Sequence, residues 1–107
     1  MLDRAPRPIT RGLSDPDILA ELGRRLRAYR RGERLTIAAL ARRAGLSPLT
    51  LQKAERGANF TMATLVRVLR ALGRLEQLEA LLPPPALSPL ALLESRRPRR
   101  AGPPRGR

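Results

Sequence analysis

Residues 36–56 read TIAALARRAGLSPLTLQKAER, and their small, apolar and polar residues follow the order expected of two short helices joined by a tight turn. When Gly45 is taken as the turn, apolar residues on either side fall on faces that meet: Leu40, Ala41, Ala44, Leu46, Leu51 and Ala54. Gly45 suits the end of the first helix because a residue without Cβ readily adopts the left-handed conformation. The stretch therefore predicts a helix-turn-helix, whose second helix has an exposed face that can enter a DNA major groove.

Flanking residues give the boundaries of these two helices. Ser47 can cap the second helix with its hydroxyl, and Pro48 fits the first turn because that position needs no N–H donor. Gly57 ends the second helix. We expect the first helix over residues 36–44 and the second over residues 47–56.

Three further helices are predicted around this pair. Ser14 opens the first of them, whose apolar residues recur at helical spacing: Ile18, Leu19, Leu22, Leu26 and Tyr29. Thr61 can cap another, whose inward face would carry Met62, Leu65, Val66, Leu69 and Leu72. A short last helix carries Leu75, Leu78, Leu81 and Leu82 and stops at the prolines that follow. The sequence thus predicts an all-α fold of five helices over residues 15–82.

The two ends of the chain differ in composition from this domain. Residues 1–14 contain two prolines and a glycine among scattered charges and are predicted to be a flexible N-terminal arm. Residues 83–107 form a Pro- and Arg-rich tail, whose basic end is either a sequence-independent DNA clamp or a solvated, disordered segment. Within the tail, SPLALLE has a helical pattern. Its leucines, Leu90, Leu92 and Leu93, either fold back onto the domain or dock on another protein.

The chain is strongly basic. It has 22 Lys and Arg residues against nine Asp and Glu, which gives a formal net charge of +13, and Lys53 is its one lysine. Arginine keeps its charge at any physiological pH and can bind a phosphate through two parallel hydrogen bonds. We therefore expect a nucleic-acid partner.

The chain contains no cysteine and no histidine. This excludes disulfides, thiol chemistry, zinc-finger sites and histidine-based acid–base catalysis. There is no glycine-rich phosphate loop either, so we expect no enzymatic activity, no cofactor, no metal and no small-molecule substrate. Because the apolar runs are too short to span a bilayer and the first residues lack the apolar segment of a secretion signal, we expect a cytoplasmic protein without membrane contact.

Between Leu22 and Leu82 the chain resembles the XRE family, the lambda-repressor-like helix-turn-helix regulators. The matching phrases, in chain order, are LGRRLRAYRRGERLT, IAALARRAGLS, PLTLQKAERG and TLVRVLRALG. The tail phrase LEALLPPPALSPLALLESRRPRR also resembles the C-terminal ends of bacterial XRE proteins of the HipB-like antitoxin type. The first resemblance implies a five-helix lambda-repressor-like DNA-binding domain, which flexible basic termini flank.

The resemblance implies that residues near the start of the second helix of the pair touch base edges. In this chain they are Pro48, Leu49, Thr50, Gln52 and Lys53. Their chemistry suits the role, since Lys53 can donate to guanine, Gln52 can bond adenine, and Leu49 can pack on a thymine methyl group. An apolar residue exposed at position 49 needs either a groove or a core neighbour, so Leu49 separates the functional interpretation from the structural one.

Phosphate contacts are implied for residues on either side of the same helix: Thr36, Arg42, Arg43, Arg56, Asn59 and Thr61. Thr36 begins a helix, where backbone N–H groups can hold a phosphate oxygen. For any single arginine, a solvated helix face is an equally good interpretation. The chain departs from the family at Ile37, where many members have a Gln that contacts both phosphate and the DNA-reading helix, so that side-chain bridge is lost here.

Two more groups of residues follow from the resemblance. Arg30 and Glu55 occupy positions where the family has an ion pair that fixes how the DNA-reading helix is mounted. The leucines of the last helix, Leu75, Leu78, Leu81 and Leu82, are expected to form a homodimer interface. Such a dimer would bind a palindromic operator with half-sites about one helical turn apart. The alternative is that all four leucines pack inside the monomer.

These expectations describe a sequence-specific, DNA-binding transcriptional regulator. The tail resemblance and the small size favour an autorepressor that is the antitoxin of a toxin–antitoxin module and holds a HipA-like kinase. A stand-alone repressor of phage or plasmid type is the alternative. A basic RNA-binding protein is less favoured, because Tyr29 and Phe60 are the only aromatic residues and provide no stacking platform for bases.

Overall fold

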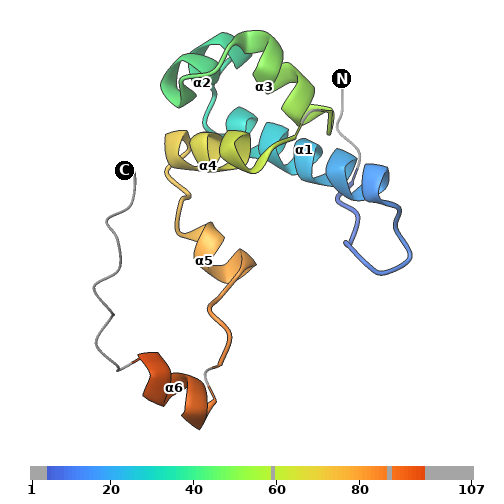
Figure 1. The fold of residues 1–107 in the computed structure, drawn as a ribbon. Coiled ribbons are helices and arrows are strands. Elements are labelled where there is room, and N and C mark those ends of the chain that lie inside the picture. Colours follow the sequence, from blue (N-terminus) through green and yellow to red (C-terminus); the bar gives the residue numbers. More distant parts are fainter. Residues whose placement is uncertain (1–4, 59, 87, 96–107) are drawn as a thin grey trace, which may run out of the picture.

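The computed structural model describes residues 5–58, 60–86 and 88–95. In this part of the chain the regular structure consists of six helices (Figure 1): α1 (Asp15–Gly32), α2 (Ile37–Ala44), α3 (Pro48–Glu55), α4 (Met62–Ala71), α5 (Gln77–Leu81) and α6 (Pro89–Ser95). The first five make up the predicted all-α domain, which is confirmed. The sixth lies in the tail, at the segment that the sequence predicts to be helical. None of the described helices is long and apolar enough to cross a membrane.

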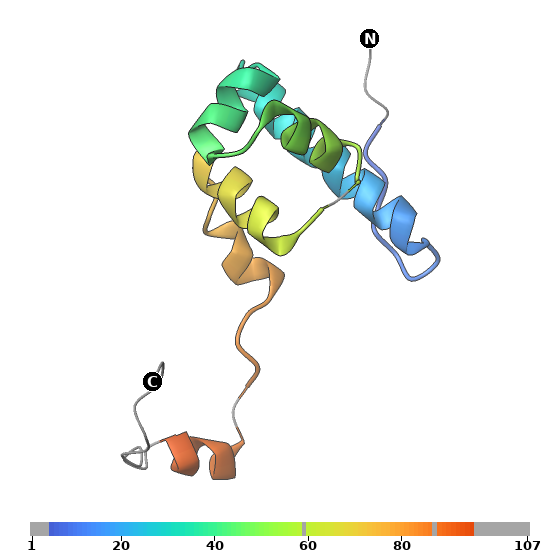
Figure 2. The ribbon, with the colours of Figure 1, turned by 45° about the horizontal axis from the view of Figure 1, so that its top comes forward.

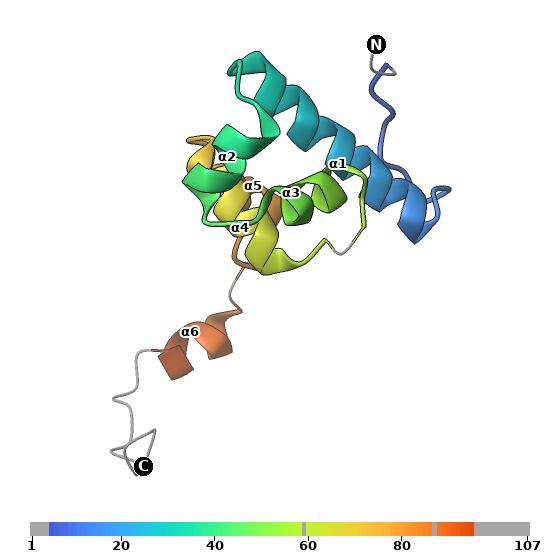
Figure 3. The same cartoon turned by 90° about the horizontal axis from the view of Figure 1, so that it is seen from above.

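The pair α2–α3 rests on the two longer helices α1 and α4. Contacts join α1 to α3, α2 to α3 and α2 to α4. Figure 2 shows α3 running alongside α1, and the view from above in Figure 3 has α2 and α3 over α4 and α5. In all three views α6 is separated from the bundle. The helix-turn-helix is therefore held from two sides while its outer face stays open.

Side-chain caps fix where four of the helices begin. The hydroxyl oxygens of Ser14, Thr36, Ser47 and Thr61 accept hydrogen bonds from the backbone N–H three residues on, at 3.0–3.2 Å. A cap of this kind contributes about 1 kcal/mol to stability. The predicted starts of these helices are confirmed to within one residue.

The turn between α2 and α3 has the conformation that the sequence predicts. Gly45 follows α2 in the left-handed conformation, with φ of +70°. The Leu46 N–H donates to the Ala41 carbonyl at 2.9 Å, which closes the turn. Because Ser47 caps the next helix directly afterwards, the chain changes direction within a few residues.

The core is built mainly from aliphatic residues: Leu26, Leu40, Ala41, Leu51, Val68, Leu69 and Leu72. One prediction for α4 is wrong, because Met62 was expected to face inward and its side chain is 71% exposed. Met62 stands on the first turn of α4, beside the buried stripe that Thr64, Val68 and Leu72 form at a spacing of four residues. Val68 is completely buried, although the sequence analysis did not place it in the core.

The backbones of α1 and α3 come very close at Gly23. A Cβ on Gly23 would lie 2.5 Å from the carbonyl oxygen of Glu55 and 2.6 Å from that of Ala54. Gly57, just past α3, makes a similar approach, because its Cβ would lie 2.7 Å from the Ala20 nitrogen. Any side chain at these two positions would push α3 away from α1. The sequence predicts Gly57 as a helix end, but no sequence pattern indicates a role for Gly23.

The described part of the N-terminal arm lies beside α1 and is attached to it (Figure 1). Arg25 donates from Nη2 to the Arg7 carbonyl at 2.8 Å, and the buried carboxylate of Glu21 accepts from Arg25 Nε at 2.9 Å and from Arg24 Nη2 at 3.1 Å. Burial raises the pKa of Glu21. Hydrogen bonds from Arg25, Arg24 and the Arg7 backbone lower it by more than burial raises it, so the pKa lies below its ordinary value of 4.5. A buried carboxylate thus links the arm to α1.

Candidate nucleic-acid interface

The helix α3 has a buried face and an exposed face. Leu51, Ala54 and Glu55 are buried against the rest of the domain. On the other side Leu49 is 55% exposed, outside the core cluster, and Gln52 is also exposed. The small Ala54 and the close approach of Gly23 keep the inner face near α1, so the outer face projects from the domain as a ridge.

The five residues predicted to touch bases occupy the first turns of α3. Pro48, Leu49 and Gln52 are exposed, and Thr50 and Lys53 are half-buried. The hydroxyl of Thr50 lies 2.8 Å from that of Ser47, whose oxygen also accepts from the Thr50 N–H at 3.1 Å. Thr50 therefore supports the cap of α3, and any base contact from its hydroxyl must share this hydrogen bond.

The residues predicted to touch phosphates lie at helix ends around α3. Arg42 and Arg43 are exposed in the last turn of α2, and Arg56 is exposed directly after α3. Thr36 and Thr61 are exposed at the starts of α2 and α4, where their hydroxyls serve as caps. Asn59, also predicted to contact a phosphate, lies outside the described residues.

An ion pair between α1 and α3 mounts the exposed helix. Arg30 donates from Nε to Glu55 Oε2 at 2.7 Å and from Nη2 to Glu55 Oε1 at 3.1 Å, so the pair is bidentate. Both residues are only 8% exposed. Arg30 Nη1 also donates to the Leu35 carbonyl at 2.7 Å, which ties down the segment that enters α2. One guanidinium thus links α1, the start of α2 and the end of α3.

A second arginine, on α4, holds the turn between α2 and α3. Arg67 of α4 donates from Nη1 to the carbonyl oxygen of Gly45 at 3.1 Å. Nothing in the sequence singles out this residue, because a single arginine on an exposed helix face looks like any other. Together with Arg30, it holds the helix-turn-helix at the segment that enters α2 and at the turn between α2 and α3.

A family model of the helix-turn-helix domain matches residues 21–82, which is more than half of the chain. The protein belongs to this helix-turn-helix family. The family is typical of XRE-like regulators, and membership places the protein among DNA-binding transcription regulators. A comparison with curated proteins gives no match.

The helix-turn-helix match ends at Leu82, so it includes the leucines that the sequence predicts as a dimer interface. These leucines divide into two kinds. Leu75 and Leu78 are half-buried, and Leu78 packs against the core, whereas Leu81 and Leu82 are exposed at the end of α5.

Among the described residues there is no group of three or more Asp or Glu that could hold a metal ion.

Proposed function

We propose that the helix-turn-helix domain binds a palindromic DNA operator in its own promoter as a homodimer and represses transcription there by blocking RNA polymerase. The observation that carries this proposal is the exposure of Leu49 on a helix whose opposite face is buried. An apolar side chain in that position gains a partner when α3 enters a major groove, where a thymine methyl group is available. The basic net charge supplies the attraction to DNA.

In this proposal the outer face of α3 reads the bases. Leu49 and Lys53 are one helical turn apart and project on the same side, so a thymine methyl contact and a guanine contact can form on neighbouring base pairs. Gln52 extends the same surface and suits adenine. Pro48 and Thr50 adjoin them at the start of the helix, where the backbone comes closest to the floor of the groove.

Phosphate contacts in this proposal fall on both sides of the groove. Thr36 at the start of α2 offers backbone N–H groups, and Arg42 and Arg43 offer exposed guanidinium groups. Arg56 and Thr61, with Asn59 between them in the chain, serve the opposite strand. The half-buried Ile37 packs against the core and leaves the first contact to the backbone and the Thr36 hydroxyl.

Dimerisation is proposed through the end of α5. Leu81 and Leu82 are exposed next to Leu78, which packs against the core, so they form the apolar surface on which a second copy could pack. One recognition helix reads only a few base pairs, and pairing two of them about 34 Å apart supplies the length of a specific site.

The test is fluorescence anisotropy with the DNA upstream of the gene and with a scrambled duplex of the same composition, between ~50 and ~200 mM salt. The variant Leu49→Ala/Lys53→Ala removes two proposed base contacts. Each such contact contributes about 1–3 kcal/mol of discrimination, so the preference for upstream DNA should fall at least tenfold. Wild type should keep its preference at the higher salt, where non-specific binding is weak.

A matched control is available in the double variant Ile9→Ala/Arg70→Ala. It also removes one exposed apolar side chain and one positive charge, but from the arm and from the end of α4. We expect the control to keep the preference for upstream DNA. If wild type and both variants bind the two duplexes equally and dissociate together as salt rises, the arginines attract DNA without reading it and the proposal is wrong.

The finer proposal is that this repressor is the antitoxin of a two-gene module and binds a HipA-like kinase. It is supported by the likeness of the tail to HipB-like antitoxins and by the small size of the chain. Co-expression with a HipA-like kinase encoded beside the gene tests it. A stable complex that relieves growth arrest would support the antitoxin role, and arrest that persists without a complex would leave the stand-alone repressor.

A further inference from the structure

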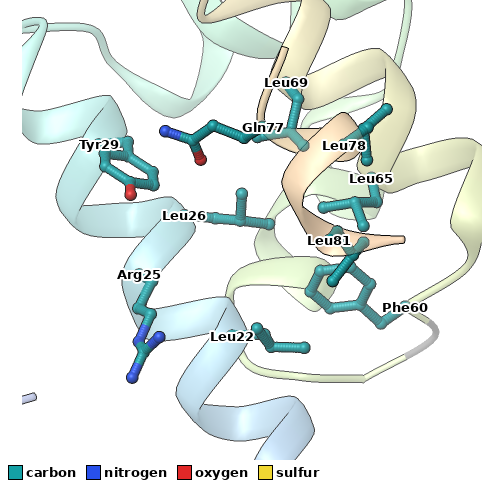
Figure 4. Close-up of a pocket in the computed structure, with 10 residues that line it drawn as sticks. All are labelled: Leu22, Arg25, Leu26, Tyr29, Phe60, Leu65, Leu69, Gln77, Leu78 and Leu81. Atoms are coloured by element: carbon teal, nitrogen blue, oxygen red, sulfur yellow. The ribbon is translucent and has the colours of Figure 1, made fainter. Parts of the chain in front are cut away.

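An apolar groove lies between α1, α4 and α5 (Figure 4). Its walls include Leu22, Leu26, Tyr29, Phe60, Leu65 and Leu81, and its volume is about 160 Å³. An aliphatic and aromatic cavity of about 150 Å³ can hold a benzene-sized group. The groove can therefore accept a leucine side chain from another segment.

The helix α6 offers such side chains. Leu90 is 68% exposed and Leu93 is 63% exposed, and their spacing of three residues puts them on the same side of the helix. A helix of only seven residues is marginal in water unless it packs on something. In the described structure α6 lies away from the bundle (Figure 1), so Leu90 and Leu93 are available to a partner.

The connection to α6 disfavours the groove of the same chain. Leu81, at the end of α5, already forms part of the groove wall, and Leu82 is followed at once by three prolines, residues 83–85. Consecutive prolines extend by about 3.1 Å per residue and resist bending, so they carry the chain away from the groove. Only three residues then remain, 86–88, to reverse its direction before α6 begins.

We propose that α6 of a second copy of this chain occupies the groove, and that the two copies exchange their α6 helices reciprocally. One of the two leucines, Leu90 or Leu93, would enter the apolar cavity and the other would pack at its open side. Glu94 would meet Arg25, which is exposed at the groove wall and whose Nε and Nη2 already bind Glu21 and the Arg7 carbonyl. The arrangement is continuous with the proposed α5 interface, because Leu81 takes part in both. This inference rests on the proposed homodimer and gives the tail a structural role in it.

Sedimentation velocity at micromolar concentrations tests the exchange with the variant Leu90→Ser/Leu93→Ser. We expect its dimer dissociation constant to rise at least tenfold over that of wild type. The control Ile9→Ser/Met62→Ser makes the same change at two other exposed apolar residues and should dimerise like wild type. A tail variant that dimerises as tightly as wild type overturns the exchange and leaves the homodimer standing. A wild type that is monomeric at every concentration overturns both.

A second measurement observes the groove directly. Tyr29 and Phe60 are the only aromatic residues of the chain and both line the groove, so every aromatic proton resonance reports on it. In the Leu90→Ser/Leu93→Ser variant, a synthetic peptide of residues 86–95 should shift both sets of resonances. Unchanged resonances at saturating peptide overturn the proposal. The proposal is also overturned if wild type is monomeric and its aromatic resonances differ from those of the Leu90→Ser/Leu93→Ser variant, because α6 would then fill the groove of its own chain.

Discussion

Removing the carboxylate of Glu55 should destabilise the whole domain. In the variant Glu55→Ala the guanidinium of Arg30 loses both partner oxygens, at 2.7 and 3.1 Å, while remaining buried. Breaking one side of a buried ion pair costs about 3–5 kcal/mol. Solvent screening reduces this figure little, because both residues are only 8% exposed.

This loss is large for a domain of this size. Small domains have about 5–15 kcal/mol of total stability, so the variant should retain a fraction of it. Since 1 kcal/mol corresponds to about 4–8 °C in Tm for a domain of 60–100 residues, we expect Tm to fall by at least about 12 °C. Specific DNA binding should weaken as well, because Glu55 is on the helix that carries the proposed base contacts.

Thermal unfolding followed by circular dichroism at 222 nm measures the effect. Glu79→Ala is the matched control, since it removes an exposed carboxylate from α5 and should leave Tm within about 2 °C of wild type. The double variant Arg30→Met/Glu55→Leu should recover part of the lost stability, because no buried charge remains. A Glu55→Ala protein that melts together with wild type would refute the argument that the pair mounts α3.

Two further predictions concern α1. Gly23→Ala should lower the free energy of unfolding by about 1–3 kcal/mol, because the new Cβ meets backbone atoms of α3. A Cβ on Gly32 meets nothing within 4 Å, so the control Gly32→Ala should be neutral or slightly stabilising. Urea unfolding of the two variants checks this. The lowered pKa of Glu21 predicts that its contribution to stability is present above pH 4.5 and is lost as the pH falls through the folded-state pKa. Glu21→Gln should therefore be less stable than wild type at pH 7, and this difference in the free energy of unfolding should shrink as the pH is lowered below 4.5 in a series of urea titrations. A difference that stays constant down to the acid unfolding of the protein would contradict the role of the charge.

The elements of the fold were predictable because they depend on local chemistry. Ser47 and Thr61 cap helices through atoms three residues away, and Gly45 turns the chain by its own backbone conformation. Periodicity then gave the inward residues of α2 and α3. It was less accurate for α4, where Met62 lies beside the buried stripe of Thr64, Val68 and Leu72 and is exposed, although Thr64 in the same turn is buried.

The contacts between distant segments were harder to predict. The sequence around Gly23 contains no turn signal. Nothing local therefore indicates that the backbone of α3 comes so close that a Cβ on Gly23 would lie 2.5 Å from the Glu55 carbonyl oxygen. Likewise, nothing in the sequence distinguishes Arg67 from other exposed arginines, and only the arrangement of the helices places the Gly45 carbonyl beside it. The Arg30–Glu55 pair could be anticipated because the family resemblance supplied the arrangement that the sequence lacks.

The two faces of α3 have a consequence for how the protein can change. The inner face is fixed by Ala54, by the glycine contact with α1 and by a buried ion pair, so substitutions there alter stability first. The outer face, which includes Leu49 and Gln52, takes part in none of these contacts. Substitutions on that face should therefore change the free energy of unfolding by only about 0.5 kcal/mol or less. If that face binds DNA as proposed, a lineage, or a laboratory library limited to those positions, can change the DNA sequence it prefers on an unchanged scaffold.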